Sequence, residues 1–261
     1  MSVGSFIRKT LGFGAIFLVL VLTGLFLFQD RMLYTPDLPV RHMKDNQVGF
    51  RDPSEQNILF ETVTLKVPHT PSDSVVGWNM YHKPDGVDRP TILFFHENSG
   101  NLGLRLDLFS VLYHEFDCDV IAFAYRGYSD SHLEAGIPHE DTLKEDTVVI
   151  MDYLERSHRK EKRLFLFGRS LGGGPGIYAA ARDPDLFEGI ILENTFTSMS
   201  DVCDDVFYVV KYFKWLILNL HWDNISIIST LKTPVMLIAG DKDQITPMHH
   251  SERLYEAATQ S

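Results

Sequence analysis

Residues 163–181, RLFLFGRSLGGGPGIYAAA, contain the most informative pattern in this sequence. The mostly apolar start of this stretch, residues 164–167, predicts a buried strand, and the glycines and alanines after Ser170 predict a closely packed helix. Between them stands Gly168-Arg169-Ser170-Leu171-Gly172. A Gly-x-Ser-x-Gly pattern at a strand-to-helix junction is typical of a turn that requires residues without a Cβ on either side of the serine. Such a turn lifts the serine oxygen above the sheet, at the positive end of the following helix.

The composition fits a globular domain with a substantial core. The chain has 261 residues, of which 44% are hydrophobic and 23% charged. A net charge of −11 argues against a nucleic-acid partner, because phosphates repel such a surface. The two cysteines, Cys118 and Cys203, cannot form a framework of several bridges, so we expect buried thiols.

An uncharged apolar run at residues 11–28 predicts a membrane helix. Its length as a helix is about 27 Å, enough for a thin bilayer. A secretory signal peptide is the alternative, but the run exceeds the usual length and no small-x-small cleavage site follows it. We therefore expect an uncleaved, single-pass anchor. Arg8 and Lys9 precede the run while Arg31, Arg41 and Lys44 follow it, so charge does not decide the orientation.

Strands and helices alternate along the rest of the chain. Residues 32–56 contain Pro36, Pro39 and Pro53 and lack periodicity, which indicates a tether. Beyond them we expect strands at 58–67, 75–82, 91–95, 120–125, 164–167, 187–192 and 235–239, and helices at 102–116, 142–154, after Ser170 and at 247–258. This order predicts an α/β fold with a mainly parallel central sheet and helices on both faces. Ligand chemistry in such folds lies at the carboxyl ends of the strands.

Two further segments flank this predicted site. His96-Glu97-Asn98-Ser99-Gly100-Asn101 directly follows a strand, where the architecture places a second oxyanion donor; an ordinary polar turn is the alternative. Residues 199–228 are rich in aromatic side chains and predict either a helical cap over a pocket or core filling. These aromatic residues are Phe207, Tyr208, Tyr212, Phe213, Trp215 and Trp222.

Five motifs carry a family resemblance. HENSGN after the first parallel strand, AYRGYSDS after the second, LFGRSLGG at the turn, ENTF after the next strand and GDKDQITP after the last resemble the α/β-hydrolase superfamily. Within it, the chain is similar to the membrane-anchored group of α/β-hydrolase domain-containing protein thirteen and the yeast Bem-forty-six proteins. The similarity runs from about Phe28 to the end of the sequence. Together with the apolar run and the aperiodic segment after it, we expect residues 1–30 as anchor, 31–57 as linker and 58–261 as an α/β-hydrolase domain with a short helical cap.

The resemblance also implies a serine hydrolase with named site residues. It puts the nucleophile at Ser170, the acid of a Ser-His-Asp triad at Asp243, and the oxyanion-hole amides at Leu171 and Asn98. The residues agree, because a serine needs a base and a carboxylate that orients it, and the short turn after residues 235–239 brings Asp243 to the same sheet edge. Asp241 and Glu193 are rivals for the acid. No cofactor is implied.

The chain departs from the family pattern at three places. Glu97 replaces the usual glycine beside the oxyanion site, and Gly174-Pro175 falls where strong helix formers are expected. The third departure is at Ser261, where we expect a C-terminal truncation that leaves out the last strand, the loop with the catalytic histidine and the last helix.

No histidine of this chain is a convincing substitute for the catalytic histidine that the family has after this point. We expect His249 and His250 on the surface, and His96 as a brace for the oxyanion loop. A metal site at His249-His250 has no supporting Cys or carboxylate spacing, so no metal is expected.

The preferred function is a membrane-anchored serine hydrolase that cleaves acyl esters or thioesters of lipids or lipidated proteins. A non-catalytic binding module with the same fold and a serine peptidase are the alternatives. The expected partners are a small-molecule or lipid acyl substrate and, through the N-terminal helix, membrane lipid. The resemblance implies an N-terminus in the cytosol, and we expect an endomembrane location such as the endoplasmic reticulum. Asn224-Ile225-Ser226 is then a glycosylation acceptor on the lumenal side.

Overall fold

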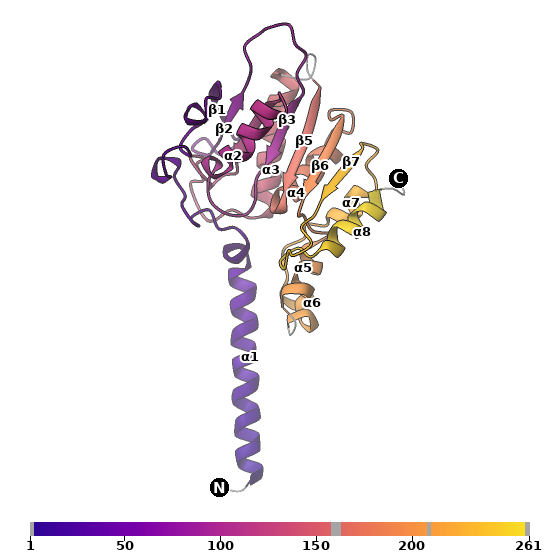
Figure 1. The fold of residues 1–261 in the computed structure, drawn as a ribbon. Coiled ribbons are helices and arrows are strands. Elements are labelled where there is room, and N and C mark those ends of the chain that lie inside the picture. Colours follow the sequence, from indigo (N-terminus) through magenta and orange to yellow (C-terminus); the bar gives the residue numbers. More distant parts are fainter. Residues whose placement is uncertain (1–2, 158–162, 208–209, 259–261) are drawn as a thin grey trace.

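The computed structural model describes residues 3–157, 163–207 and 210–258, so Tyr208 of the predicted cap lies outside the described residues. A long helix, α1 (Val3–Leu33), projects from an α/β domain (Figure 1). Its segment Thr10–Leu33 is long and apolar enough to cross a membrane. Both cysteines are free and buried, as expected.

The domain is built on one sheet of seven strands with the order β1-β2-β4-β3-β5-β6-β7. The strands from β4 to β7 in that order are parallel, while β2 pairs antiparallel with both β1 and β4. All residues of β3 and β4 are buried, as continuous apolar strands covered on both faces should be. The bounds are β1 (Phe60–Lys66), β2 (Ser74–Met80), β3 (Thr91–Phe95), β4 (Asp119–Ala124), β5 (Leu164–Arg169), β6 (Gly189–Glu193) and β7 (Val235–Ile238).

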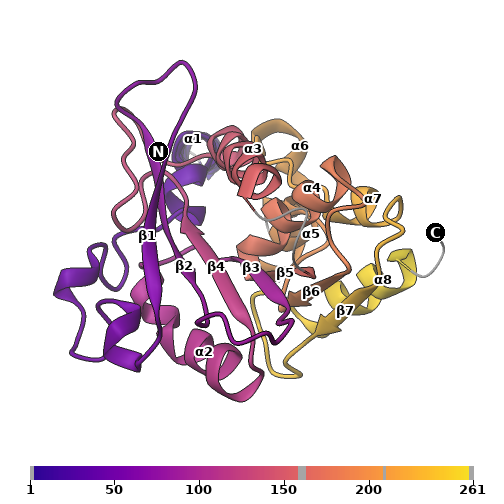
Figure 2. The same ribbon diagram turned by 90° about the horizontal axis from the view of Figure 1, so that it is seen from above.

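Helices cover both faces of this sheet, which confirms the predicted α/β-hydrolase type of fold. In Figure 2, α3 and α4 lie on one face and α2 on the other. The helices are α2 (Leu106–Ser110), α3 (Glu140–Ser157), α4 (Gly173–Arg182), α5 (Met199–Val206), α6 (Lys214–Ile217), α7 (Asn224–Ile228) and α8 (Met248–Ala258). Short 3-10 turns span Met43–Asp45, Pro53–Gln56, Leu102–Arg105, Ser170–Gly172 and Val210–Tyr212.

The helix expected at 102–116 is broken into three pieces. The 3-10 turn Leu102–Arg105 precedes α2, and a π-helical turn, Val111–Glu115, follows it. The buried apolar residues of this segment are Leu102, Leu106, Phe109, Leu112 and Tyr113, whereas Phe116 is exposed. The changes of pitch on either side of α2 shift the buried face along this segment and leave Phe116, the last residue of the expected helix, on the surface.

The segment expected to be a tether is instead packed against the domain. Tyr34 is buried, and its hydroxyl accepts a hydrogen bond of 3.0 Å from the indole of Trp222. Thr35 pairs with Ser99 as an isolated parallel bridge. These contacts join the end of α1 to the loop after β3. The domain boundaries 1–30, 31–57 and 58–261 stay predictions.

The cap region combines both predicted roles of its aromatic residues. Trp222 is buried under α4, where a Cβ on Gly174 would overlap its ring, so this tryptophan is core. Trp215 on α6 is 82% exposed. Helices α5 and α6 lie at the edge of the domain beside the upper part of α1 (Figure 1), and α6 contacts α1.

Candidate active site

The turn between β5 and α4 has the geometry of a nucleophile elbow. Ser170 has a positive φ of 52°, an uncommon conformation for a residue with a Cβ. A Cβ on Gly168 would approach the carbonyl oxygen of Gly172, and a Cβ on Gly172 would overlap that of Phe95. The two glycines are therefore required because backbone passes within contact of their Cα atoms. The hydroxyl of Thr195 donates to the Ser170 carbonyl oxygen at 2.8 Å and holds the turn.

A pocket of about 350 Å³ brings the predicted site residues together. Ser170, Leu171, Asn98 and Asp243 all line it. They come from the ends of β5, β3 and β7, as expected for the carboxyl edge of a parallel sheet. Neither rival acid lines this pocket: Asp241 is exposed, and Glu193 pairs with Arg169 at 3.3 Å.

Asp243 is held as an ionised, oriented carboxylate. One oxygen accepts hydrogen bonds from the backbone N–H groups of Ile245 and Thr246, each at 2.9 Å, and the other accepts from the Thr246 hydroxyl at 3.1 Å. Burial alone would raise the pKa of Asp243, but these bonds hold it below its ordinary value. The carboxylate therefore stays charged at neutral pH.

The loop after β3 is fixed by its neighbours on several sides. The side-chain amide of Asn98 donates to the carbonyl oxygen of Leu33 at 2.8 Å, and the Asn98 carbonyl accepts from the Tyr128 hydroxyl at 2.9 Å. His96 is buried against Tyr125, whose N–H donates to Nε2, while Nδ1 donates to the Glu97 carbonyl. Burial and the nearby Arg105 charge lower the pKa of His96 to about 3. The imidazole is thus a neutral brace, as the sequence suggests.

Glu97 does not present an unbalanced charge to this site. Its carboxylate accepts from Nε of Arg105 at 2.8 Å, and its other oxygen lies 3.5 Å from Nε of Arg169. Burial raises the pKa of Glu97, but the charge and hydrogen bond of Arg105 outweigh it, and the net shift is downward. Arg105 also donates to the Ser99 carbonyl at 2.7 Å. Two guanidinium groups therefore offset the negative charge that Glu97 brings to the oxyanion site.

Pro175 costs the elbow helix little. It is the third residue of α4 (Gly173–Arg182), and the first four N–H groups of a helix have no acceptor inside the helix. The missing N–H of Pro175 is consequently not a defect of the fold.

The expectation that His249 and His250 are both surface residues was wrong. His250 is fully buried, and its Nδ1 accepts from the Thr197 N–H at 3.2 Å. Nε2 of His250 and Nε2 of His249 lie 2.9 and 3.0 Å from one carboxylate oxygen of Asp205. The two histidines thus face α5, and neither lines the Ser170 pocket. The burial of α8 against α5 could not be read from two adjacent polar residues.

Asp205, His249 and His250 are the one group within the described ranges that could hold a metal ion, with ligand atoms within 4.8 Å of one another. The Thr197 N–H bonded to Nδ1 favours the tautomer with a proton on Nε2 of His250. Nε2 of His250 lies 2.9 Å from Asp205, but it has no hydrogen-bond partner with suitable geometry among the described residues. Sequence spacing missed this carboxylate because it lies on another helix, α5.

The glycosylation site at Asn224 is inaccessible in this fold. Asn224 is 1% exposed, and its side-chain nitrogen donates to the Phe196 carbonyl at 2.9 Å. A glycan needs this nitrogen and open space around it, so the expectation of a surface acceptor was wrong. Asn224 begins the short helix α7 against the core.

Sequence comparisons place the chain among related proteins. Residues 128–261 match the prolyl oligopeptidase family. The α/β hydrolase domain-containing protein WAV2 of Arabidopsis thaliana is 32% identical over 95% of this chain and 80% of its own length. Protein bem46 of Schizosaccharomyces pombe is 30% identical over 92% and 79%, respectively. An uncharacterized membrane protein of Saccharomyces cerevisiae is 34% identical over 66% of this chain and 60% of its own length.

Solved structures show the same fold at low sequence identity. The esterase Pf2001 of Pyrococcus furiosus aligns with a TM-score of 0.61 at 14% identity, covering 82% of this chain and 83% of the esterase. The acylaminoacyl peptidase of Pyrococcus horikoshii aligns with a TM-score of 0.54 at 16% identity, covering 77% of this chain and 35% of the peptidase. Esterases and peptidases are thus both found with this fold.

Proposed function

This chain belongs to the prolyl oligopeptidase family, within the α/β-hydrolase group that includes WAV2 and bem46, and from that premise we propose that it is a membrane-anchored serine hydrolase of acyl esters or thioesters. The observation that carries the proposal is Ser170 at a φ of 52° in a pocket that it shares with Asp243. A strained nucleophile turn beside an oriented carboxylate is the arrangement that acyl transfer to serine requires.

The proposed chemistry begins with attack of Ser170 Oγ on the acyl carbonyl carbon. The carbonyl oxygen gains the negative charge, which the N–H groups of Leu171 and Asn98 stabilise. The alcohol or thiol leaves with a proton, and water then releases the acyl group from Ser170. The base is a histidine whose imidazole joins Ser170 to Asp243. None of the described residues that line the pocket is a histidine, so the base is the part of this mechanism that they do not supply.

Esters and thioesters of apolar acyl groups are the proposed substrate class. The apolar anchor, and an apolar cavity that adjoins the Ser170 pocket, support a substrate from the membrane. A serine peptidase is the second candidate, because the family match over residues 128–261 is to a peptidase family. Both reactions use the same nucleophile and differ in the leaving group.

The proposed topology is single-pass, with α1 in an endomembrane and the hydrolase domain in the lumen. A relative that is described as a membrane protein supports the anchor. Because Asn224 is buried, its glycosylation cannot report the orientation. Protease protection of the domain in sealed microsomes tests it: a protected domain is expected, and digestion in intact vesicles would reverse the orientation.

Hydrolysis assays on Ser170→Ala test the function. Membranes from cells that express the protein from its own gene are given nitrophenyl esters of increasing chain length, an acyl thioester and an aminoacyl nitroanilide. We expect ester and thioester hydrolysis that falls by about three powers of ten or more in Ser170→Ala. Ser110→Ala, on α2 behind the sheet, should leave it unchanged. Cleavage of the nitroanilide alone would favour the peptidase, and equal ester hydrolysis by both variants would refute the nucleophile.

A further inference from the structure

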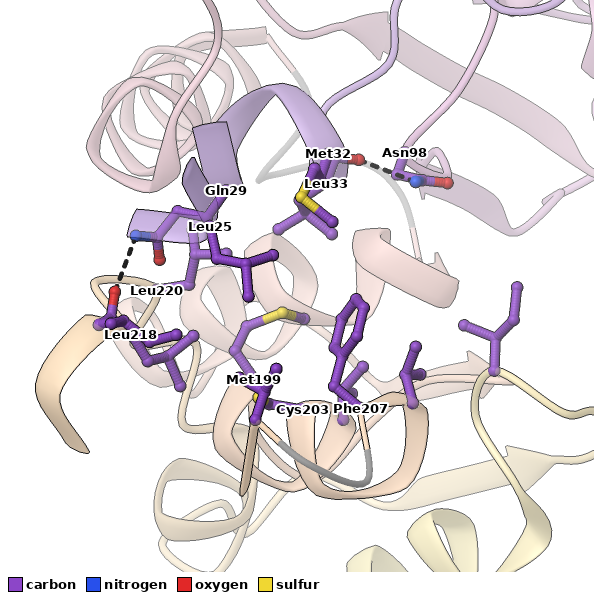
Figure 3. A pocket seen from close by; sticks show the side chains of 15 residues that line it. Leu25, Gln29, Met32, Leu33, Asn98, Met199, Cys203, Phe207, Leu218 and Leu220 are labelled. Carbon is purple, nitrogen blue, oxygen red and sulfur yellow. Dashed lines mark hydrogen bonds between the residues drawn. The ribbon is translucent and has the colours of Figure 1, made fainter. Parts of the chain in front are cut away.

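An apolar cavity of about 300 Å³ lies between the end of α1 and the cap (Figure 3). Leu25, Gln29 and Met32 line it from α1, and Met199 and Phe207 from α5 and the residue after it. The steps from Leu25 to Gln29 and from Gln29 to Met32 are each close to one helical turn, so these residues share one face of α1. The helix expected to serve only as an anchor therefore forms one wall of a cavity whose other wall is the cap.

This cavity adjoins the Ser170 pocket. Leu33, Asn98, Met199, Val202 and Ile245 line both. An elongated ligand in the cavity therefore has one end beside Asn98, in the pocket that contains Ser170. The shared wall makes the two spaces parts of one elongated site, with a polar end at the strand termini and an apolar end against α1.

The polar side chains in the cavity wall are already engaged. Gln29 donates through Nε2 to the Ile217 carbonyl at 3.0 Å and accepts through Oε1 from the Asn219 N–H at 2.8 Å. The Asn98 amide donates to the Leu33 carbonyl at 2.8 Å (Figure 3). No charged side chain is among the described residues that line the cavity. Such a wall offers dispersion and burial of apolar surface to a ligand, which suits a hydrocarbon chain.

The same hydrogen bonds lock α1 to both sides of the site. Gln29 fixes the end of α6, and Leu33 fixes the oxyanion loop through Asn98. The width of the cavity is thus set by the position of α1. Any shift of this helix would move the wall of the cavity and the loop that carries Asn98 together.

The position of the cavity along α1 indicates where its ligand comes from. Leu25 lies within the uncharged run of residues 11–28, and Gln29 directly follows it. On the cap beside α1, Trp215 is 82% and Tyr212 62% exposed, and Lys211 lies next to Tyr212. Aromatic and basic side chains at the end of a spanning helix are typical of the headgroup region. The cavity therefore lies at the level of the membrane surface.

We propose that this cavity holds the acyl chain of the substrate, that the chain enters from the bilayer, and that α1 is a wall of the acyl site. The assignment of the ester or thioester carbonyl to Ser170 rests on the proposed function. Binding of the chain itself does not, because the cavity and its contacts are independent of the base and of turnover.

Photolabelling with a hydrocarbon probe tests this assignment. The full chain carrying Ser170→Ala, in lipid nanodiscs, is irradiated with hexadecanoic acid that bears a diazirine in mid-chain, and the labelled peptides are identified by mass spectrometry. We expect adducts concentrated on residues 25–33 of α1 and 199–207 of the cap, and competition by unlabelled hexadecanoic acid. Adducts spread evenly along α1, without competition, would show contact with bulk lipid alone and overturn the proposal.

A matched pair of substitutions on one helix keeps the test specific. Leu25→Trp fills the cavity from α1, whereas Leu27→Trp adds the same bulk at a position 63% exposed and outside the cavity wall. Both changes add an apolar side chain to an apolar helix, so neither is expected to prevent folding. We expect at least a fivefold loss of competed labelling in Leu25→Trp and no change in Leu27→Trp. Equal labelling of the two would overturn the cavity assignment, even if Ser170 were shown independently to be the nucleophile.

Discussion

Replacing Ser170 by glycine should stabilise the fold relative to replacing it by alanine. Both variants lose the hydroxyl, so their difference isolates the backbone. At a φ of 52°, a residue with a Cβ carries about 1–2 kcal/mol of strain that glycine does not. Glycine also lowers the free energy of unfolding by about 0.4–1 kcal/mol, because it gives the unfolded chain more conformational freedom than alanine does. The free energy of unfolding should therefore be higher in Ser170→Gly than in Ser170→Ala by about 0.5–1 kcal/mol.

Ser110 is the matched control for this prediction. It is also a serine, but it ends α2 with an ordinary helical φ of −61°. There, glycine should be less stable than alanine by up to about 1 kcal/mol. The two pairs are compared by urea denaturation in detergent, followed by tryptophan fluorescence. If the glycine variant were less stable than the alanine variant at both sites, the backbone at Ser170 would not be strained.

Three other predictions concern the charges around the site. The pKa of His96 is lowered to about 3 in the folded chain. As the pH falls below about 6.5, the His96 imidazole therefore gains a proton in the unfolded chain but not in the folded one. This should lower the free energy of unfolding by about 2 kcal/mol between pH 7.5 and pH 5, a loss that His96→Gln should lack in urea titrations at the two pH values. Arg105→Met should lower the free energy of unfolding by about 3 kcal/mol, because it leaves the buried Glu97 carboxylate without its main partner. The loss should be clearly smaller in a Glu97→Gln background, and equal losses in a double-mutant cycle would contradict this pairing. Asp243→Asn should lower kcat for ester hydrolysis about 10⁴-fold, while Asp241→Asn should leave it unchanged. The reverse result would identify Asp241 as the acid of the triad.

The sheet and the elbow were predictable because their determinants are local. The strands Thr91–Phe95 and Leu164–Arg169 contain the continuous apolar runs 92–95 and 164–167, which is what a strand covered on both faces requires. The glycines on either side of Ser170 mark the turn by their own geometry. The expected strands therefore differ from the observed ones mainly at their ends.

The features that the sequence did not predict depend on partners far along the chain. Tyr34 packs into the domain because Trp222 donates to it across 188 residues of chain. His250 is buried because α8 lies against Thr197 and Asp205. Asn224 looks like an exposed acceptor until its bond to Phe196 is known. None of these contacts leaves a periodic pattern in the sequence.

Two side chains that support the site were also missed. Thr195, in the stretch ENTF, gave no signal beyond its place after a strand, yet its hydroxyl holds the Ser170 carbonyl. Arg105 lies in a segment interpreted as an amphipathic helix, and its buried guanidinium neutralises Glu97. A buried arginine beside an unusual glutamate is a possible sequence signal, but only once the loop and the helix are known to be adjacent.

Labelling by a fluorophosphonate shows directly whether Ser170 is the reactive nucleophile. The protein, expressed from its own gene in cells, is treated with the probe in intact membranes, purified and digested, and the adduct is located by mass spectrometry. We expect one dominant adduct on the peptide that contains Ser170, its loss in Ser170→Ala and its retention in Ser110→Ala. An adduct on another serine, or equal labelling of wild type and Ser170→Ala, would contradict the account.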